Sequence, residues 1–333
     1  MPGRGTLTSY QAFAWIMLTF TIVPLAARAC LRLAGVNALA FVGSAEPAPT
    51  RLAALRKSFI TKFSYYDNER EPAPVPPPGE LEAVYYDAPK GQNVAYVSPV
   101  RPGPRRPAIV WIQGGDCASI GASSWERDPP DNAQSVASFR KIGFVQMYPA
   151  LRGAHFNAGE HETFLGEVDD VVAAGRFIAS RPDVDPTRVY LGGHSTGATL
   201  VLLTAESTSF FRAVFALGPA GDIRQHTSNA GLPDDAPEDE YRLRSPAYFL
   251  NDIVTPTFII EGEHGKHDAL QLFKQQLASA PVHVLEIPNA DHFDVIYPAT
   301  IVIIKAINGD TEARPRLDVT GLAISKILAG LRR

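Results

Sequence analysis

The fold is decided by one stretch of this 333-residue chain, Arg188-Val-Tyr-Leu-Gly-Gly-His-Ser-Thr-Gly-Ala-Thr-Leu200. Its first half is β-branched and apolar, which predicts a buried strand, and its second half is small and apolar, which predicts a helix packed on a sheet. The turn between them, Gly193-His-Ser-Thr-Gly197, fits G-x-S-x-G. Such a turn strains the serine backbone, and side chains two residues away on either side would collide. Ser195 is therefore the candidate nucleophile, at a helix N-terminus whose dipole favours negative charge.

Strands and helices are predicted to alternate through the rest of the chain. Apolar runs such as Ala108–Ile112 are continuous, which is typical of strands covered on both faces. Residues 82–88 and 94–100 predict an antiparallel pair before them. This order predicts an α/β fold, with a mostly parallel, twisted sheet and helices on both faces. The remaining expected strands cover 144–148, 213–217, 256–260 and 282–287, and the expected helices cover 131–140, 162–180, 269–278, 298–307 and 322–331.

The N-terminal part of the chain is predicted to lie outside the catalytic domain. Residues 1–45 contain an uncharged stretch, Gly5–Ala27, which suits either a membrane anchor or the apolar region of a signal peptide. Residues 46–80 carry two proline clusters, which predict a stiff linker. The catalytic domain then covers 81–333, with a polar insertion at about 220–250. We expect the protein to be membrane-associated or exported, on a side of the membrane that the sequence leaves open.

Composition excludes several classes of function. The net charge is −4 and charged residues make up 20% of the chain, so nothing indicates a nucleic-acid partner. The two cysteines, Cys30 and Cys117, form neither a disulfide framework nor a zinc pattern. His264 and His267 share a glycine-containing loop, but a metal site would need a third ligand from elsewhere. We therefore expect no cofactor and no metal.

A serine nucleophile needs a base, and the base needs a carboxylate that fixes its tautomer. Where G-x-S-x-G supplies the nucleophile, the acid and then the histidine follow it along the chain. His292 comes directly after the last predicted strand, at the sheet edge where functional loops gather. His283 alternates with apolar residues inside that strand, which indicates a structural role. We therefore expect His292 to be the base.

The acid is expected in the loop after the strand 256–260. Asp268 is our first choice and Glu263 the alternative, while Asp222, after the preceding strand, is a third choice. Asp268 also suits the N-cap position of the helix 269–278, worth about 1 kcal/mol. The two roles of Asp268 are compatible.

The oxyanion of a tetrahedral intermediate needs backbone N–H donors that already point at it. Thr196, the residue after the nucleophile, is one expected donor. The other should come from Gly114 or Gly115, in the loop after the strand 108–112, where glycines let the backbone approach a substrate closely.

Several short motifs occur between about Glu82 and Ile307. They are Gln113-Gly-Gly, Glu167-Val-Asp-Asp170, Arg181-Pro-Asp-Val-Asp-Pro186, Gly193-His-Ser-Thr-Gly197, Arg244-Ser-Pro246 before Thr255-Pro256, and Asp291-His-Phe293. Together they resemble the α/β-hydrolases of the prolyl oligopeptidase-like group, a group that also includes dienelactone hydrolase-like and esterase-like enzymes. The resemblance implies a Ser195–acid–His292 triad that hydrolyses esters or amides through an acyl-enzyme. The chain departs from the group at Gly265, where the group usually carries its acid.

Three hypotheses about function remain. The first is a carboxylesterase that acts on small-molecule esters. The second is an aminopeptidase or acylpeptide hydrolase that acts on short peptides. The third is a catalytically inactive α/β-hydrolase that serves as a binding or scaffold protein, against which the intact Ser195 and His292 argue.

Overall fold

The computed structural model describes residues 50–65, 71–226 and 231–333. Residues 1–45, for which we predicted a signal peptide or membrane anchor, lie outside the described residues. Among the residues that are described, no helix combines the length and the apolar character that crossing a membrane requires.

One eight-stranded sheet forms the centre of the domain, in the order β1-β2-β4-β3-β5-β6-β7-β8. β1 and β2 pair antiparallel, β2 pairs antiparallel with β4, and every following pair is parallel. The expected antiparallel pair and mostly parallel sheet are thus confirmed. The strands are β1 Glu82–Ala88, β2 Gly91–Val97, β3 Arg106–Ile112, β4 Val145–Pro149, β5 Val184–His194, β6 Val214–Leu217, β7 Thr257–Gly262 and β8 Val282–Ile287.

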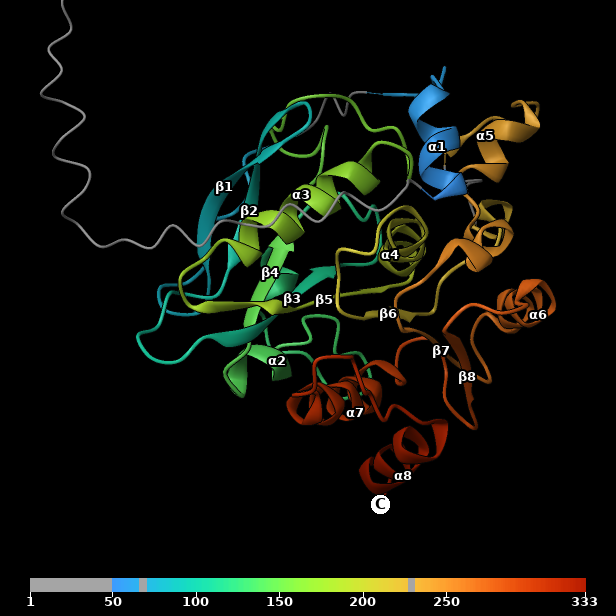
Figure 1. Cartoon of the computed structure of the whole chain (residues 1–333). Coiled ribbons are helices and arrows are strands. Elements are labelled where there is room, and N and C mark those ends of the chain that lie inside the picture. The colour runs from blue at the N-terminus through green and yellow to red at the C-terminus, as the bar shows by residue number, and fades with distance from the viewer. Residues whose placement is uncertain (1–49, 66–70, 227–230) are drawn as a thin grey trace, which may run out of the picture. The chain divides into compact units, whose positions relative to one another are not determined.

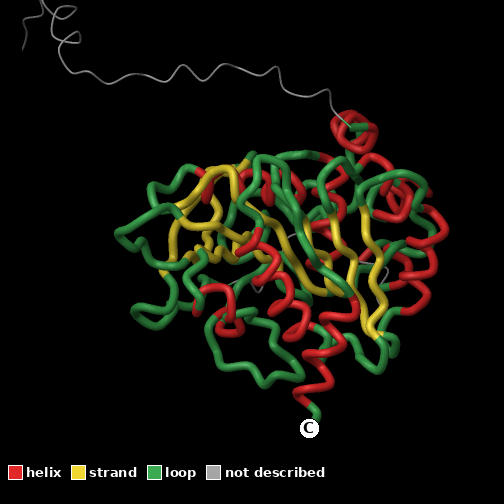
Figure 2. Tube along the Cα trace, turned by 60° about the horizontal axis from the view of Figure 1, so that its bottom comes forward, coloured by secondary structure: helices red, strands yellow, loops and turns green. Residues whose placement is uncertain are grey.

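Helices cover both faces of the sheet (Figures 1 and 2). α3, α4 and α6 pack with one apolar cluster, and α2, α7 and α8 with the other. Side chains of β5 alternate between the two, since Val189 and Leu191 join the first cluster and Tyr190 the second. The helices are α1 Arg51–Ser58, α2 Ser138–Lys141, α3 Glu167–Ala179, α4 Thr196–Ser207, α5 Glu238–Arg242, α6 His267–Gln276, α7 Ile296–Gly309 and α8 Gly321–Leu331.

The helix predicted over 131–140 is much shorter in the structure. Only α2, Ser138–Lys141, is helical there. The Asp128 carboxylate accepts the Ser135 N–H, and Val136 has a φ of 39°, which a right-handed helix cannot include. Local side-chain bonding therefore replaces helix over the first part of this segment.

Part of the predicted linker 46–80 belongs to the folded domain. α1 packs against α4, and its Leu52 is completely buried. The Leu52 N–H donates to the Asp252 carboxylate at 3.0 Å, and the Arg51 guanidinium donates to the Tyr248 carbonyl at 2.8 Å. The described residues from Arg51 onward therefore belong to the same compact unit as the sheet.

Glu206 is a buried carboxyl group in α4, and among the described residues its oxygens have no hydrogen-bond partner. Burial, and then the neighbouring Asp252 carboxylate, raises the pKa of Glu206 well above its ordinary value. The folded state therefore binds this proton more tightly than the unfolded state does. Below the pKa that Glu206 has in the unfolded state, its burial as a carboxyl group does not depend on pH. As the pH rises above that value, the burial of Glu206 lowers the free energy of unfolding increasingly.

Glu206→Gln should therefore melt at a higher temperature than the wild type at about pH 8, because the amide never ionises. The difference should shrink toward about pH 3, where the wild-type carboxyl group is protonated in both states. Thermal unfolding followed by circular dichroism at the two pH values measures it. A variant that is less stable than the wild type at the higher pH would mean that Glu206 is ionised and paired in the native protein.

Candidate active site

Ser195 lies at the turn between β5 and α4, with φ 57° and ψ −118°. This conformation is rare for a residue other than glycine. The two flanking glycines permit it. A Cβ on Gly193 would lie 2.7 Å from the Gly197 backbone, and a Cβ on Gly197 would lie 2.3 Å from the Ile112 carbonyl oxygen. The collisions expected from the sequence are therefore real, and the turn holds the hydroxyl at the carboxyl edge of the parallel strands.

His292 follows β8 and forms a hydrogen-bonded pair with Glu261, at the end of β7. His292 Nδ1 and Glu261 Oε2 are 2.9 Å apart. Glu261 is only 1% exposed, and it also accepts N–H groups from Gly262 and Lys266 at 2.7 and 3.1 Å. Burial alone would raise the pKa of Glu261, but the bonds from His292 and the two N–H groups outweigh it and hold that pKa below its ordinary value. The pair is therefore an imidazole beside a charged carboxylate.

The carboxylate at His292 is thus neither Asp268 nor Glu263, the residues expected from the sequence. Asp268 is exposed in the first turn of α6, whose N-cap is Lys266, so the expected capping role of Asp268 is also wrong. Glu263 accepts the Asn289 N–H at 2.8 Å.

The physical reason for the displaced acid is the missing side chain at Gly265. A Cβ there would lie 2.4 Å from Glu261 Oε1, so the carboxylate from the strand fills the space that a loop side chain would need. The third choice, Asp222, bonds instead to Arg224 and Tyr248.

His292 and Ser195 lie on the same rim of the sheet, on either side of the end of β6. The Ser195 N–H donates to the Leu217 carbonyl at 2.8 Å. The His292 ring packs against the next residue, Gly218, where a Cβ would lie 2.4 Å from His292 Cε1. Because Nδ1 faces Glu261, the other ring nitrogen, Nε2, is free to act as a base.

His194, the residue before the nucleophile, fixes the backbone of His292. Its Nε2 lies 3.0 Å from the His292 carbonyl oxygen, which can only accept, so Nε2 carries the proton. Burial, followed by the neighbouring His292, lowers the pKa of His194 to about 4, so this ring is neutral at physiological pH. Within the described parts of the chain, His194 Nδ1 is buried without a partner.

Replacing His194 with Phe keeps a ring but leaves the His292 carbonyl without its donor. We expect a stability loss of about 1–2 kcal/mol and a roughly tenfold slower reaction of Ser195 with an active-site probe, because His292 loses its anchor. Thermal unfolding and labelling rates measure the two effects. His283→Phe is the matched control, since His283 is exposed and stacks on Phe258, away from the sheet edge that carries Ser195 in the described structure. Equal labelling rates for the two variants would show that His194 does not contribute to the reactivity of Ser195.

The expected oxyanion donors also lie at the nucleophile. A Cβ on Gly114 would approach the Ser195 Cβ to 3.3 Å, so this glycine loop passes directly beside Ser195. Among the described residues, the N–H groups of Gly114 and Gly115 have no hydrogen-bond acceptor. Thr196 begins α4, where the first N–H groups have no acceptor inside the helix. These donors are available to a developing oxyanion.

Residues 131–292 match the family model described as the prolyl oligopeptidase family. The matched range contains Ser195, Glu261 and His292. Residues 131–292 are a prolyl oligopeptidase family domain.

Proteins similar to this chain include a curated relative and several solved structures. The uncharacterized peptidase YtmA of Bacillus subtilis (strain 168) is 29% identical over 150 residues, which cover 41% of this chain and 58% of YtmA. A puromycin-hydrolyzing peptidase of Mycobacterium tuberculosis superposes with a TM-score of 0.57 at 18% identity, over 69% of this chain and 40% of that one. An acylaminoacyl peptidase of Pyrococcus horikoshii gives 0.54 at 14% identity, over 68% and 41%. These structures share the fold, and the chain spans well under two thirds of the length of each of these proteins.

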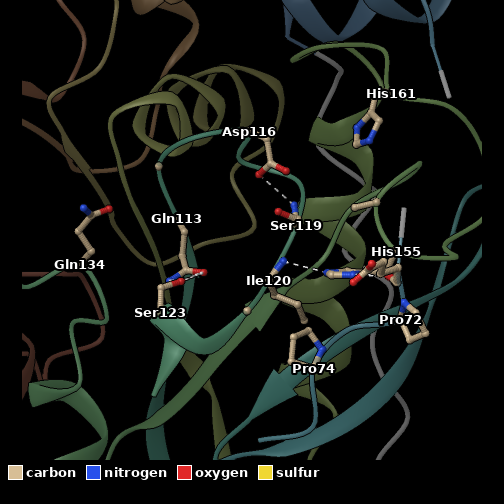
Figure 3. A pocket seen from close by; sticks show the side chains of 14 residues that line it. Pro72, Pro74, Gln113, Asp116, Ser119, Ile120, Ser123, Gln134, His155 and His161 are labelled. Atoms are coloured by element: carbon tan, nitrogen blue, oxygen red, sulfur yellow. Dashed lines mark hydrogen bonds between the residues drawn. The ribbon is translucent and has the colours of Figure 1, made fainter. Parts of the chain in front are cut away.

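A cavity of about 450 Å³ borders the loop that carries Gly114 (Figure 3). Gln113 is held at its edge by Ser123, at 3.2 Å. On the other side His155 accepts the Ile120 N–H at 3.1 Å and lies 2.9 Å from the Glu71 carbonyl oxygen, which joins the proline-rich segment to the loop. The cavity therefore opens next to Gly114, in the loop that passes beside Ser195.

Sequence reasoning missed Glu261 and His194. A signal for Glu261 was present, because a carboxylate at the end of a buried apolar strand has to be paired. For His194 the sequence offered no signal, since the x positions of G-x-S-x-G accept many residues.

Proposed function

We propose that this protein is a serine hydrolase that cleaves amide bonds of short peptides through an acyl-enzyme at Ser195. One observation carries the proposal. The strained Ser195 lies on the same rim of the sheet as the His292–Glu261 pair, beside a glycine loop whose N–H groups have no acceptor among the described residues. The family match and the curated relative, itself called a peptidase, favour peptides over the small esters that we first expected.

The proposed chemistry uses each group in turn. Ser195 Oγ attacks the carbonyl carbon while His292 Nε2 accepts its proton, and Glu261 stabilises the imidazolium that forms. The oxyanion accepts hydrogen bonds from Thr196 and Gly114. The C–N bond then breaks as the imidazolium protonates the leaving amine. A water molecule, deprotonated by His292, attacks the acyl-enzyme in the same way and restores the serine.

The test is labelling with a fluorophosphonate probe, followed by a substrate panel. We expect the wild type to be labelled at Ser195 and Ser195→Ala to remain unlabelled. Aminoacyl anilides with a free amine, N-acylated aminoacyl anilides and short p-nitrophenyl esters then distinguish aminopeptidase, acylpeptide hydrolase and esterase. Turnover of the esters alone would support our first hypothesis, a carboxylesterase. A folded wild type that is not labelled by the probe would support the scaffold hypothesis.

We further propose that the apolar stretch Gly5–Ala27 directs the protein to a membrane or to export. Cell fractionation of the full chain, compared with a version lacking residues 1–45, tests this. Recovery of both versions in the same soluble compartment would contradict it.

A further inference from the structure

A lysine side chain reaches the nucleophile from the loop after β7. Lys266 Nζ lies 3.4 Å from Ser195 Oγ and 3.2 Å from the Gly218 carbonyl oxygen. The backbone N–H of the same residue donates to Glu261 at 3.1 Å, which fixes the start of the side chain beside the histidine–carboxylate pair. Among the described residues, this ammonium group is the hydrogen-bond partner of the serine hydroxyl.

The direction of this hydrogen bond is fixed by chemistry. A lysine ammonium group has three donors and no acceptor, whereas a serine hydroxyl has one donor and two lone pairs. Lys266 therefore occupies a lone pair of Ser195 Oγ, and the O–H of Ser195 remains available as a donor. We infer that Lys266 is a further catalytic residue of the proposed reaction, whose ammonium group stabilises the negative charge that develops on Ser195 Oγ. This inference rests on the proposed function.

The length of the contact indicates when Lys266 acts. A charge-assisted N–H···O bond is usually 2.7–2.9 Å long, so at 3.4 Å the contact of Lys266 with the resting hydroxyl is weak. The bond should shorten as the proton leaves Oγ, so it is stronger in the transition state than in the ground state, as catalysis requires. The same charge returns to Oγ when the acyl-enzyme breaks down, so Lys266 assists both halves of the reaction.

The charge on Lys266 depends on its surroundings. Burial lowers the pKa of Lys266, and the Glu261 carboxylate opposes that effect. The imidazoles of His292, His194 and His226 also face this centre. Burial lowers the pKa of His226 to about 4, with Lys266 as the next cause, so His226 brings no competing charge near neutral pH. The ammonium charge is therefore lost as the pH rises through a pKa below the usual value for lysine.

The experiment compares the rate of fluorophosphonate labelling of Ser195 across pH for the wild type, Lys266→Met and Lys274→Met. Lys274 is the matched control, since it pairs with Glu286 on the surface. We expect Lys266→Met to label about tenfold or more slowly with an unchanged melting temperature. The wild type and Lys274→Met should both lose rate at alkaline pH as Lys266 deprotonates, and Lys266→Met should lack that fall.

A second variant separates charge from packing. Lys266→Arg keeps a cation at every accessible pH, so it should label faster than Lys266→Met and also lack the alkaline fall. A Lys266→Met variant that matches the wild type in rate and pH profile would overturn the inference, and so would an arginine variant no faster than the methionine one. Either outcome leaves Ser195 labelling in the wild type intact, whereas failure of the proposed function would show as an unlabelled wild type.

Discussion

Glu261→Gln should reduce turnover by about three to four orders of magnitude while the protein stays folded. The glutamine side chain has nearly the same shape as the glutamate it replaces, but it carries no charge to stabilise the imidazolium of His292. Its NH₂ group can also face Nδ1, which would place the ring proton on Nε2, the nitrogen that has to accept the serine proton. Turnover of the best substrate in the panel, together with the labelling rate of Ser195, measures the loss.

Two matched controls accompany this variant. Asp268→Asn and Glu263→Gln remove the carboxylates that the sequence suggested. Both residues are exposed, and among the described residues neither carboxylate is hydrogen-bonded to His292. Each should keep turnover within about twofold of the wild type, since surface substitutions rarely disturb a site they do not touch. A turnover several hundredfold lower in Asp268→Asn, with nearly normal turnover in Glu261→Gln, would show that Asp268 and not Glu261 is the catalytic acid.

Asp170→Asn should destabilise the fold by about 3–5 kcal/mol, because it removes the charge opposite a buried arginine. Asp170 is completely buried in α3. Its carboxylate accepts the Arg152 backbone N–H, Nε and Nη2 at 2.9, 3.0 and 2.9 Å. Without that charge, the buried guanidinium keeps its bond to the Glu162 carboxylate at 2.8 Å, the one other carboxylate it pairs with among the described residues. The melting temperature should fall by roughly 10 °C for a domain of this size.

The neighbouring residue supplies the control for Asp170. Asp169 also carries a carboxylate in α3 and pairs with Arg56 at 3.5 Å, but its side chain is 58% exposed. Asp169→Asn should therefore cost at most about 1 kcal/mol. Similar melting temperatures for the two variants would show that the buried Arg152–Asp170 pair stabilises the fold no more than the exposed pair does.

Much of the fold could be predicted because its signals are local. A continuous apolar run such as Ile109–Ile112 has to be a strand covered on both faces. The errors lie where a tertiary contact or a single side chain overrides the local pattern. Asp128 and Val136 shorten the helix predicted over 131–140. The packing of α1 against α4 makes part of the predicted linker belong to the folded domain.

The sequence by itself determined the nucleophile turn, since two glycines at fixed spacing are what lets Ser195 adopt its strained backbone next to Ile112. Only the tertiary structure decided which carboxylate meets His292. β7 and β8 pair in parallel, with Gly262 opposite Ile287. The end of β7, which carries Glu261, therefore lies beside the loop after β8, which carries His292. That pairing, and the space left by Gly265, gives Glu261 a contact that no spacing along the chain could reveal.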